Sequence, residues 1–130
     1  MPPHKEPSAR QFAKGLGKLR RPGGRVLVML QAHHRAVGRA LNAEALAKKV
    51  GYASFRAVNL QYGLFANRLG KAMGIEDASL NLVSDFLGPK EVTNREWILV
   101  MKPNFATALS EAKWDRYEQP GTSLTKRPGT

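Results

Sequence analysis

The sequence contains no cysteine. The chain therefore forms neither a disulfide nor a thiolate metal site, which is compatible with a reducing compartment. Long apolar runs are also missing. The longest run near the N-terminus is residues 26–30, whereas a membrane-spanning helix needs about 20 apolar residues, and nothing resembles a signal peptide. We expect a cytoplasmic protein with no membrane partner, associated with the nucleoid if the source is bacterial.

Residues that an active site would need are scarce as well. His33 and His34 are the single histidine pair, and adjacent residues on a helix point about 100° apart. No carboxylate cluster accompanies them at metal-ligand spacing, and Asp85, Glu91 and Glu96 show no spacing signature. No glycine-rich phosphate loop ends in the required Lys-Ser/Thr. The sequence predicts a non-enzyme with no cofactor and no metal, and the histidine pair as one residue at the core edge and one facing solvent.

Acidic residues are outnumbered, with 10 Asp and Glu against 21 Lys and Arg and a net charge of +11. This balance favours a polyanionic partner, nucleic acid above all. The 130 residues suit one domain. Residues 1–24 hold six basic residues and one acid, with three prolines, and predict a flexible basic arm. A solubilising tail, or a weak amphipathic helix through Phe12, Leu16 and Leu19, is the alternative. Residues 115–130, rich in proline and glycine, predict a disordered tail.

Residues 42–74 have the pattern of a helix-turn-helix. Asn42 is a good N-cap, helical spacing of apolar residues follows, and Gly51 stands where a left-handed stop is needed. After a short turn, Ser54 can cap a second helix over residues 54–73. Its apolar stripe comprises Phe55, Val58, Tyr62, Phe65, Leu69 and Met73. So short a turn predicts a steep crossing of the two helices.

The flanking patterns complete a domain over residues 25–114. Residues 26–37 predict a first helix with Val26, Met29, Leu30, His33 and Val37 on one side. Alternation over residues 80–87 and the apolar run 97–101 predict two antiparallel strands joined by a longer loop. Residues 104–114 predict a closing helix. The fold class is mostly α with a small β ribbon: a winged helix-turn-helix-like arrangement of three helices, a two-stranded antiparallel wing and a C-terminal helix.

The second helix of the pair has a polar side opposite its apolar stripe. Side chains of the kinds that bond base edges lie there, and we predict groove or base contacts for Arg56, Asn59, Asn67 and Lys71. The bland alternative is an ordinary solvated face. Phosphate contacts are predicted for the basic residues of the arm, helix and wing: Lys5, Lys14, Arg20, Arg21, Arg25, Arg68, Lys90 and Arg95.

Four residues on this helix do not suit a simple DNA-reading face. Leu60 and Leu64 point to the centre of the polar side, which predicts cover by the arm, the C-terminal helix or a second copy, or contact with thymine methyls; protein cover is favoured. Gly63 and Gly70 each cost roughly 1 kcal/mol against alanine in a helix. They predict close approach of another backbone, with packing inside the protein as the blander explanation. Together the four form a candidate protein interface.

The run Asn59-Leu60-Gln61-Tyr62-Gly63 resembles part of a known module. That module is a small helical unit found ahead of HNH-type nuclease domains in bacterial restriction-like proteins. Residues 46–52, Trp97 and residues 103–114 add to the resemblance, which covers about residues 26–114. It implies a DNA-associated module and assigns no base-reading residue. The chain departs from the pattern, because it has three histidines in all and no downstream nuclease domain.

The sequence therefore leads to three hypotheses. The first is a non-enzymatic protein that binds double-stranded DNA through the helix-turn-helix, with the arm and wing on phosphates. The second is a protein-protein adaptor, a homodimer, or an inhibitor of a nucleic-acid enzyme from a mobile element, docking through the leucine and glycine surface. The third is an RNA- or ribosome-associated protein, which the same positive charge would serve.

Overall fold

The computed structural model describes residues 6–87 and 98–115. The helices in this part are α1 (Ala9–Gly17), α2 (Gly24–Arg35), α3 (Ala43–Val50), α4 (Phe55–Ala72) and α5 (Pro103–Glu111). Short 3₁₀ turns lie at η1 (Val37–Arg39) and η2 (Leu80–Leu82), and the strands are β1 (Ala40–Asn42), β2 (Ser84–Leu87) and β3 (Ile98–Met101). The molecule is thus mostly helical with a small antiparallel sheet.

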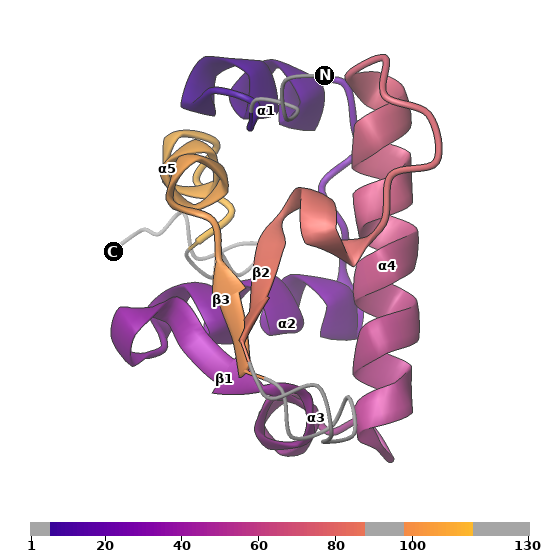
Figure 1. The fold of residues 1–130 in the computed structure, drawn as a ribbon, viewed down its shortest axis with the longest axis vertical. Helices are drawn as coiled ribbons and strands as arrows, with labels where there is room; N and C mark the ends of the chain where they lie inside the picture. Colours follow the sequence, from indigo (N-terminus) through magenta and orange to yellow (C-terminus); the bar gives the residue numbers. More distant parts are fainter. Residues whose placement is uncertain (1–5, 88–97, 116–130) are drawn as a thin grey trace, which may run out of the picture.

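The longest element, α4, runs along one side of the molecule (Figure 1). α3 packs at its N-terminal end, and α1 lies near its C-terminal end, where α1 also packs against α5. Aromatic side chains connect these elements. Phe105 of α5 lies edge-on to Phe12 of α1 at 5.4 Å between ring centroids, and 6.2 Å from Phe65 of α4. One continuous apolar core therefore joins both ends of α4.

Local signals at the helix-turn-helix are confirmed. The Asn42 side chain accepts a hydrogen bond from the Ala45 N–H at 2.7 Å and caps α3. Gly51 has φ of 91°, the left-handed conformation that ends α3. Ser54 caps α4 by accepting from the Arg56 N–H at 3.2 Å. On α4 the side chains of the middle of the predicted stripe are buried: Val58, Tyr62, Phe65 and Leu69.

The sheet has three strands where two were predicted. Its order is β1-β3-β2, with β1 antiparallel to β3 and β3 antiparallel to β2. Strand β1 was missed because three residues are too few to show alternation, and because Asn42 both ends the strand and caps α3. The first predicted strand also begins later than expected. Residues 80–82 form η2 instead, where the Ser79 hydroxyl donates to Asn81 Oδ1 at 2.8 Å and favours a local turn.

Helix α1 differs from the flexible arm expected over residues 1–24. Ser8 and Gln11 form a capping box, with N–H to side-chain distances of 3.1 and 2.8 Å. Phe12 and Leu16 are fully buried against the core. The alternative of an amphipathic helix is therefore right for this segment. Its exposed side carries the cations that suggested an arm, including Arg10 and Lys14.

Smaller differences occur at two other helices. α2 ends at Arg35, two residues early, so that Val37 is 96% exposed instead of packed. α5 ends at Glu111, although Trp114 beyond it is buried against Phe65. The predicted wing loop and residues 116–130 of the predicted tail lie outside the described residues. Within the described part, no helix has both the length and the apolar character to cross a membrane.

Candidate nucleic-acid interface

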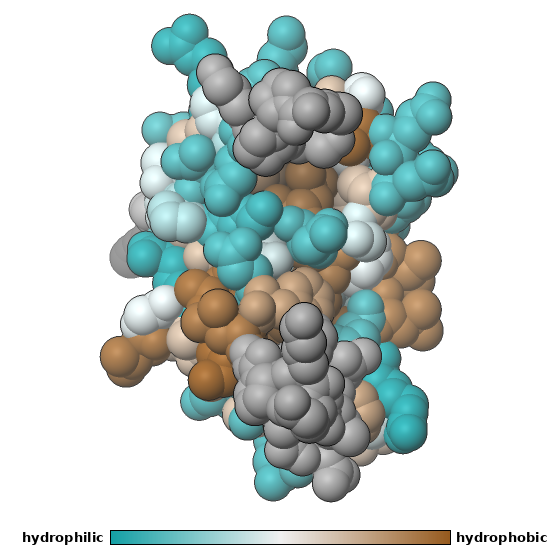
Figure 2. Space-filling view, in the orientation of Figure 1, coloured by the Kyte–Doolittle hydropathy of each residue, from teal (hydrophilic) through white to brown (hydrophobic). Residues whose placement is uncertain are grey.

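The outer face of α4 carries a stripe of exposed residues spaced four apart. Arg56, Leu60, Leu64 and Arg68 follow one another along the helix and all are exposed. Lys71 is exposed near the end of the same helix. We call Arg56, Leu60, Leu64 and Arg68 the α4 stripe. In Figure 2, hydrophobic atoms at the middle of the α4 edge separate hydrophilic atoms above and below them.

The predicted base-contact residues fall into two groups. Arg56 and Lys71 are exposed, and the Arg56 guanidinium lies 5.0 Å from the centre of the Phe55 ring. Asn59 is half-buried. Asn67 differs from the prediction, because its side-chain amide donates to the Ala78 carbonyl oxygen at 3.0 Å. It ties the loop after α4 to the helix, which spacing along one helix cannot reveal.

Cations gather at the turn between α3 and α4. The Arg25 guanidinium at the start of α2 lies 6.0 Å from the centre of the Tyr52 ring, directly after Gly51. Lys48 and Lys49 are exposed on the last turn of α3. Sequence reasoning missed these two lysines, although the helical period that placed the α3 core also places them on its outer side. Together with Arg56 they form a basic cluster, which we call the turn cluster (Arg25, Lys48, Lys49 and Arg56).

Tyr52, whose ring lies next to Arg25, is half-buried at the turn. Partial desolvation raises the pKa of the Tyr52 hydroxyl, and the charge of Arg25 acts in the opposite direction. The Tyr52 N–H donates to the Ala47 carbonyl oxygen at 3.0 Å, which ties the backbone of Tyr52 to the end of α3. Arg25 thus lies at the turn beside a residue whose backbone is anchored to the helix-turn-helix.

Other predicted phosphate contacts lie at the far end of α4. Lys14 and Arg20 are exposed on and after α1, and Arg21 is half-buried. The neighbouring Lys18 ammonium donates to the Ala72 carbonyl oxygen at 3.3 Å, which places this segment beside the C-terminal end of α4. The structure therefore separates Lys14 from the turn cluster, whereas Arg20 and Arg21 lie on the short segment that leads from Lys18 to Arg25. Lys5, Lys90 and Arg95 lie outside the described residues.

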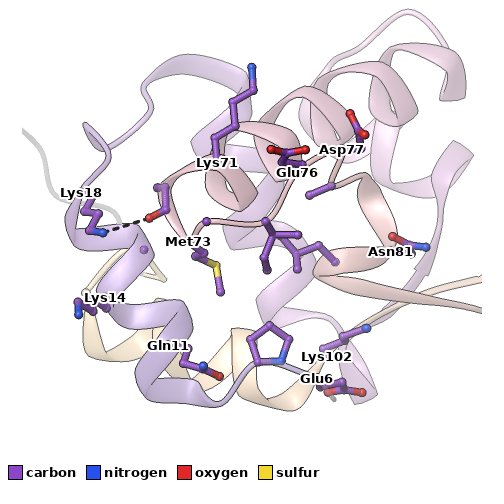
Figure 3. Close-up of a pocket in the computed structure, with 17 residues that line it drawn as sticks. Glu6, Gln11, Lys14, Lys18, Lys71, Met73, Glu76, Asp77, Asn81 and Lys102 are labelled. Atoms are coloured by element: carbon purple, nitrogen blue, oxygen red, sulfur yellow. Dashed lines mark hydrogen bonds between the residues drawn. The ribbon is translucent and has the colours of Figure 1, made fainter. Parts of the chain in front are cut away.

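A groove of about 1180 Å³ opens between α1 and the loop that follows α4 (Figure 3). Its charged lining is mixed, with the lysines Lys14, Lys18, Lys71 and Lys102 and the acids Glu6, Glu76 and Asp77. Lys71 extends away from the floor of the groove, whereas the Met73 side chain reaches into it. The groove offers neither a uniformly basic nor a uniformly acidic surface.

The two glycines of α4 have different surroundings. A Cβ on Gly70 would collide with Ala78, and the Ile75 N–H donates to the Gly70 carbonyl oxygen at 2.7 Å. Gly70 therefore packs against the loop after its own helix and does not belong to an interface. A Cβ on Gly63 would meet no atom of residues 6–87 and 98–115 within 4 Å. The fold gives no packing reason for this glycine.

His33 holds α4 against the sheet. Its Nδ1 lies 2.8 Å from the Tyr62 hydroxyl, and its Nε2 lies 2.9 Å from the Leu99 carbonyl oxygen. Since the carbonyl only accepts, Nε2–H donates to it and Nδ1 accepts from the Tyr62 O–H. Burial lowers the pKa of His33 and raises the pKa of Tyr62. Both groups are neutral and structural, so His33 belongs to the core itself and not to its edge.

His34 and Ser110 link α2 to α5. The Ser110 hydroxyl donates to Asp115 Oδ2 at 3.1 Å, and His34 Nε2 lies 3.1 Å from the same hydroxyl oxygen. Because the single hydroxyl proton is directed to Asp115, His34 acts as donor to the serine oxygen. A nucleophilic serine needs the reverse, with its proton directed to the histidine. In residues 6–87 and 98–115 no group of three or more His, Asp or Glu is placed to hold a metal.

Comparisons with protein families, with curated proteins and with solved structures found no match to this chain.

Proposed function

We propose that this protein is a non-enzymatic DNA-binding protein of the winged helix-turn-helix type. The order of the helices α2, α3 and α4, followed by the antiparallel strands β2 and β3, supports this proposal, and β1 adds a third strand that pairs with β3. The observation that carries the proposal is the turn cluster. Arg25, Lys48, Lys49 and Arg56 gather around the N-terminal end of α4, while the opposite side of α4 is buried in the core.

In this proposal α4 inserts its N-terminal half into the major groove. The groove is about 12 Å wide and accepts a helix of about 10–12 Å diameter. Arg56, at the second position of α4, is the residue placed to reach base edges. Arg25, Lys48 and Lys49 bind phosphates on either side of the turn, and Arg68 and Lys71 continue the basic face along the helix. The predicted wing, with Lys90 and Arg95, adds backbone contacts.

The cations of α1 contribute less to the proposed DNA affinity than the turn cluster does. With 18 residues, α4 is about 27 Å long, so the cations of α1, Lys14 among them, lie nearly one duplex turn away from the turn cluster. They strengthen binding only where the duplex extends past the recognition site. The main electrostatic contribution is therefore assigned to the turn cluster and not to an arm.

A mobility-shift assay tests the proposal. The full chain is titrated against random duplex DNA, single-stranded DNA and structured RNA at low and at high salt. The proposal expects preferential retardation of duplex DNA and a steep loss of affinity with salt. Duplex affinity that does not change with salt contradicts it, and preference for RNA favours the ribosome-associated or RNA-binding alternative.

A second candidate function is protein contact, as an adaptor or inhibitor. It is favoured by the exposed Leu60 and Leu64 at the centre of the α4 face. The double variant Arg56→Ala/Lys71→Ala distinguishes the two functions. DNA affinity falls sharply if α4 binds DNA, whereas contact with a protein through the leucines survives. The resemblance to a module ahead of HNH-type nucleases agrees with either function, since such a module works next to DNA.

A further inference from the structure

Leu60 and Leu64 remain uncovered by the helices that were expected to shield them. Leu60 is 58% exposed and Leu64 is 51% exposed. α1 packs against α5 and near the C-terminal end of α4, and the buried residues of both α1 and α5 belong to the core. The two leucines lie one helical turn apart at the centre of the outer face. They form a small apolar surface on the element proposed to enter the groove.

Gly63 widens this surface. Among the described residues, none lies within 4 Å of a Cβ placed there, so alanine would fit this part of the fold. Mid-helix glycine is less favourable than alanine by roughly 1 kcal/mol. A glycine that packing does not require, adjacent to two exposed leucines, allows an external surface to approach the backbone of α4 closely.

The positive charges at the two ends of the α4 stripe indicate which partner can bind the two leucines. Arg56 precedes Leu60 by one turn and Arg68 follows Leu64 by one turn, so each cation lies about 6 Å along the axis from a leucine. If a second copy docked its leucines on these, an antiparallel pairing would oppose Arg56 to Arg68 of the other copy. A parallel pairing would oppose Arg56 to its own equivalent. Both pairings place like charges together, which disfavours a homodimer.

Duplex DNA matches the same pattern. Anionic phosphates line both edges of the major groove, and the 5-methyl group of thymine is the apolar feature of its floor. An apolar centre between two cationic ends is complementary to that surface. Resting on the proposed DNA-binding function, we propose that Leu60 and Leu64 contact the 5-methyl groups of pyrimidines, so that the protein prefers thymine or 5-methylcytosine at the centre of its site.

Two pairs of duplexes test this preference. The first pair is an alternating adenine-thymine duplex and the same duplex with deoxyuridine for thymidine. The second is an alternating cytosine-guanine duplex with and without 5-methylcytosine. Each pair differs only in methyl groups on the groove floor. Wild-type affinity is expected to be higher for the methylated member of both pairs, by about fourfold for each methyl buried, from the transfer free energy of a methylene.

The double variant Leu60→Ala/Leu64→Ala should bind the two members of each pair equally. Its control, Val28→Ala/Val37→Ala, removes exposed apolar surface outside α4 and should keep the preference. Because all four side chains are exposed, thermal unfolding followed by circular dichroism should show each variant folded.

Four results would overturn the inference. Wild-type protein that binds duplex DNA but ignores the methyl groups refutes it and leaves DNA binding intact. A preference unchanged in Leu60→Ala/Leu64→Ala refutes it as well. A dimer in sedimentation equilibrium that this variant abolishes, and that persists on DNA, assigns the leucines to a second copy. Absence of any DNA binding by the wild type refutes both the inference and the proposed function.

Discussion

The residues of α4 fall into two groups: some are buried and stabilise the fold, and others are exposed. Tyr62 is fully buried, with its hydroxyl bonded to His33, whereas Leu60 and Leu64 on the other side of the helix face solvent. The residue type alone did not show which polar side chains are exposed and which are bonded within the fold. Asn67 serves the loop after α4, and Lys48 and Lys49, which were not predicted, stand at the turn. Contact with Ala78 beyond the end of α4 accounts for Asn67, whereas the helical period of α3 places Lys48 and Lys49 on its outer side.

Titration of His33 should reduce stability at acidic pH. Burial, the largest cause, lowers the pKa of His33 in the folded state below 6.5, while in the unfolded chain it stays near that value. The unfolded state therefore binds the proton first as pH falls. The free energy of unfolding should decline below about pH 6.5, with a slope approaching about 1.4 kcal/mol per pH unit. Urea denaturation across this range measures it. A His33→Gln variant should lose that slope, and a slope retained in it would contradict the assignment.

Tyr62→Phe tests the hydrogen bond that places His33. The variant removes the O–H that Nδ1 accepts and leaves a buried nitrogen without a donor, at a cost of about 1–3 kcal/mol in unfolding free energy. Urea denaturation at neutral pH gives the value. Tyr52→Phe is the matched control, because Tyr52 lies at the surface of the turn and its hydroxyl should matter little to stability. Equal losses of unfolding free energy for the two substitutions would contradict a stabilising hydrogen bond between Tyr62 and His33.

The two α4 glycines should respond to alanine with opposite signs. Gly63→Ala should stabilise the protein by up to about 1 kcal/mol, because its Cβ meets open space. Gly70→Ala should destabilise it, since Ala78 and the Ile75 carbonyl oxygen occupy the position of the new Cβ. Thermal unfolding of both variants gives the comparison. Stabilisation by Gly70→Ala would show that the loop after α4 moves freely, contrary to the packing observed.

At the scale of elements, local signals predicted α3 and α4, and distant contacts explain what was missed. Asn42, Gly51 and Ser54 act within a few residues, so caps and stops could be predicted from sequence. β1 exists because β3, far along the chain, pairs with it. α1 packs because α5 supplies Phe105 to Phe12. Composition favoured an arm for the N-terminal segment, whereas the helical spacing of Phe12 and Leu16, which suggested the alternative, agrees with the structure.

Helix α1 should contribute strongly to stability. Phe12→Ala removes a fully buried ring in contact with Phe105 and should cost about 3–5 kcal/mol. Lys14→Ala on the exposed side of the same helix should change stability by less than about 0.5 kcal/mol. Urea denaturation measures both. If Phe12→Ala cost no more than Lys14→Ala, α1 would be an appendage and the original expectation of an arm would hold.

For the whole molecule, the net charge of +11 is distributed over more than one surface. The turn cluster lies at one end of α4, and Lys14, Lys18 and Lys71 line the mixed groove at the other. Sequence could predict the total charge and the helix-turn-helix, but the separation of the cations into two surfaces depends on how α1 packs. The proposed function depends on the first of these surfaces.

The change of duplex affinity with salt concentration tests most directly whether the turn cluster is the DNA-binding surface. Each phosphate contact removed should reduce the steepness of the plot of log affinity against log salt by about 0.9, so Lys48→Ala/Lys49→Ala should reduce it by about 1.8. Arg10→Ala/Lys113→Ala removes the same charge from exposed positions on α1 and after α5, and should leave the slope close to that of the wild type. Equal slopes for the two double variants, or no measurable duplex binding by the wild type, would contradict the turn cluster as the DNA-binding surface.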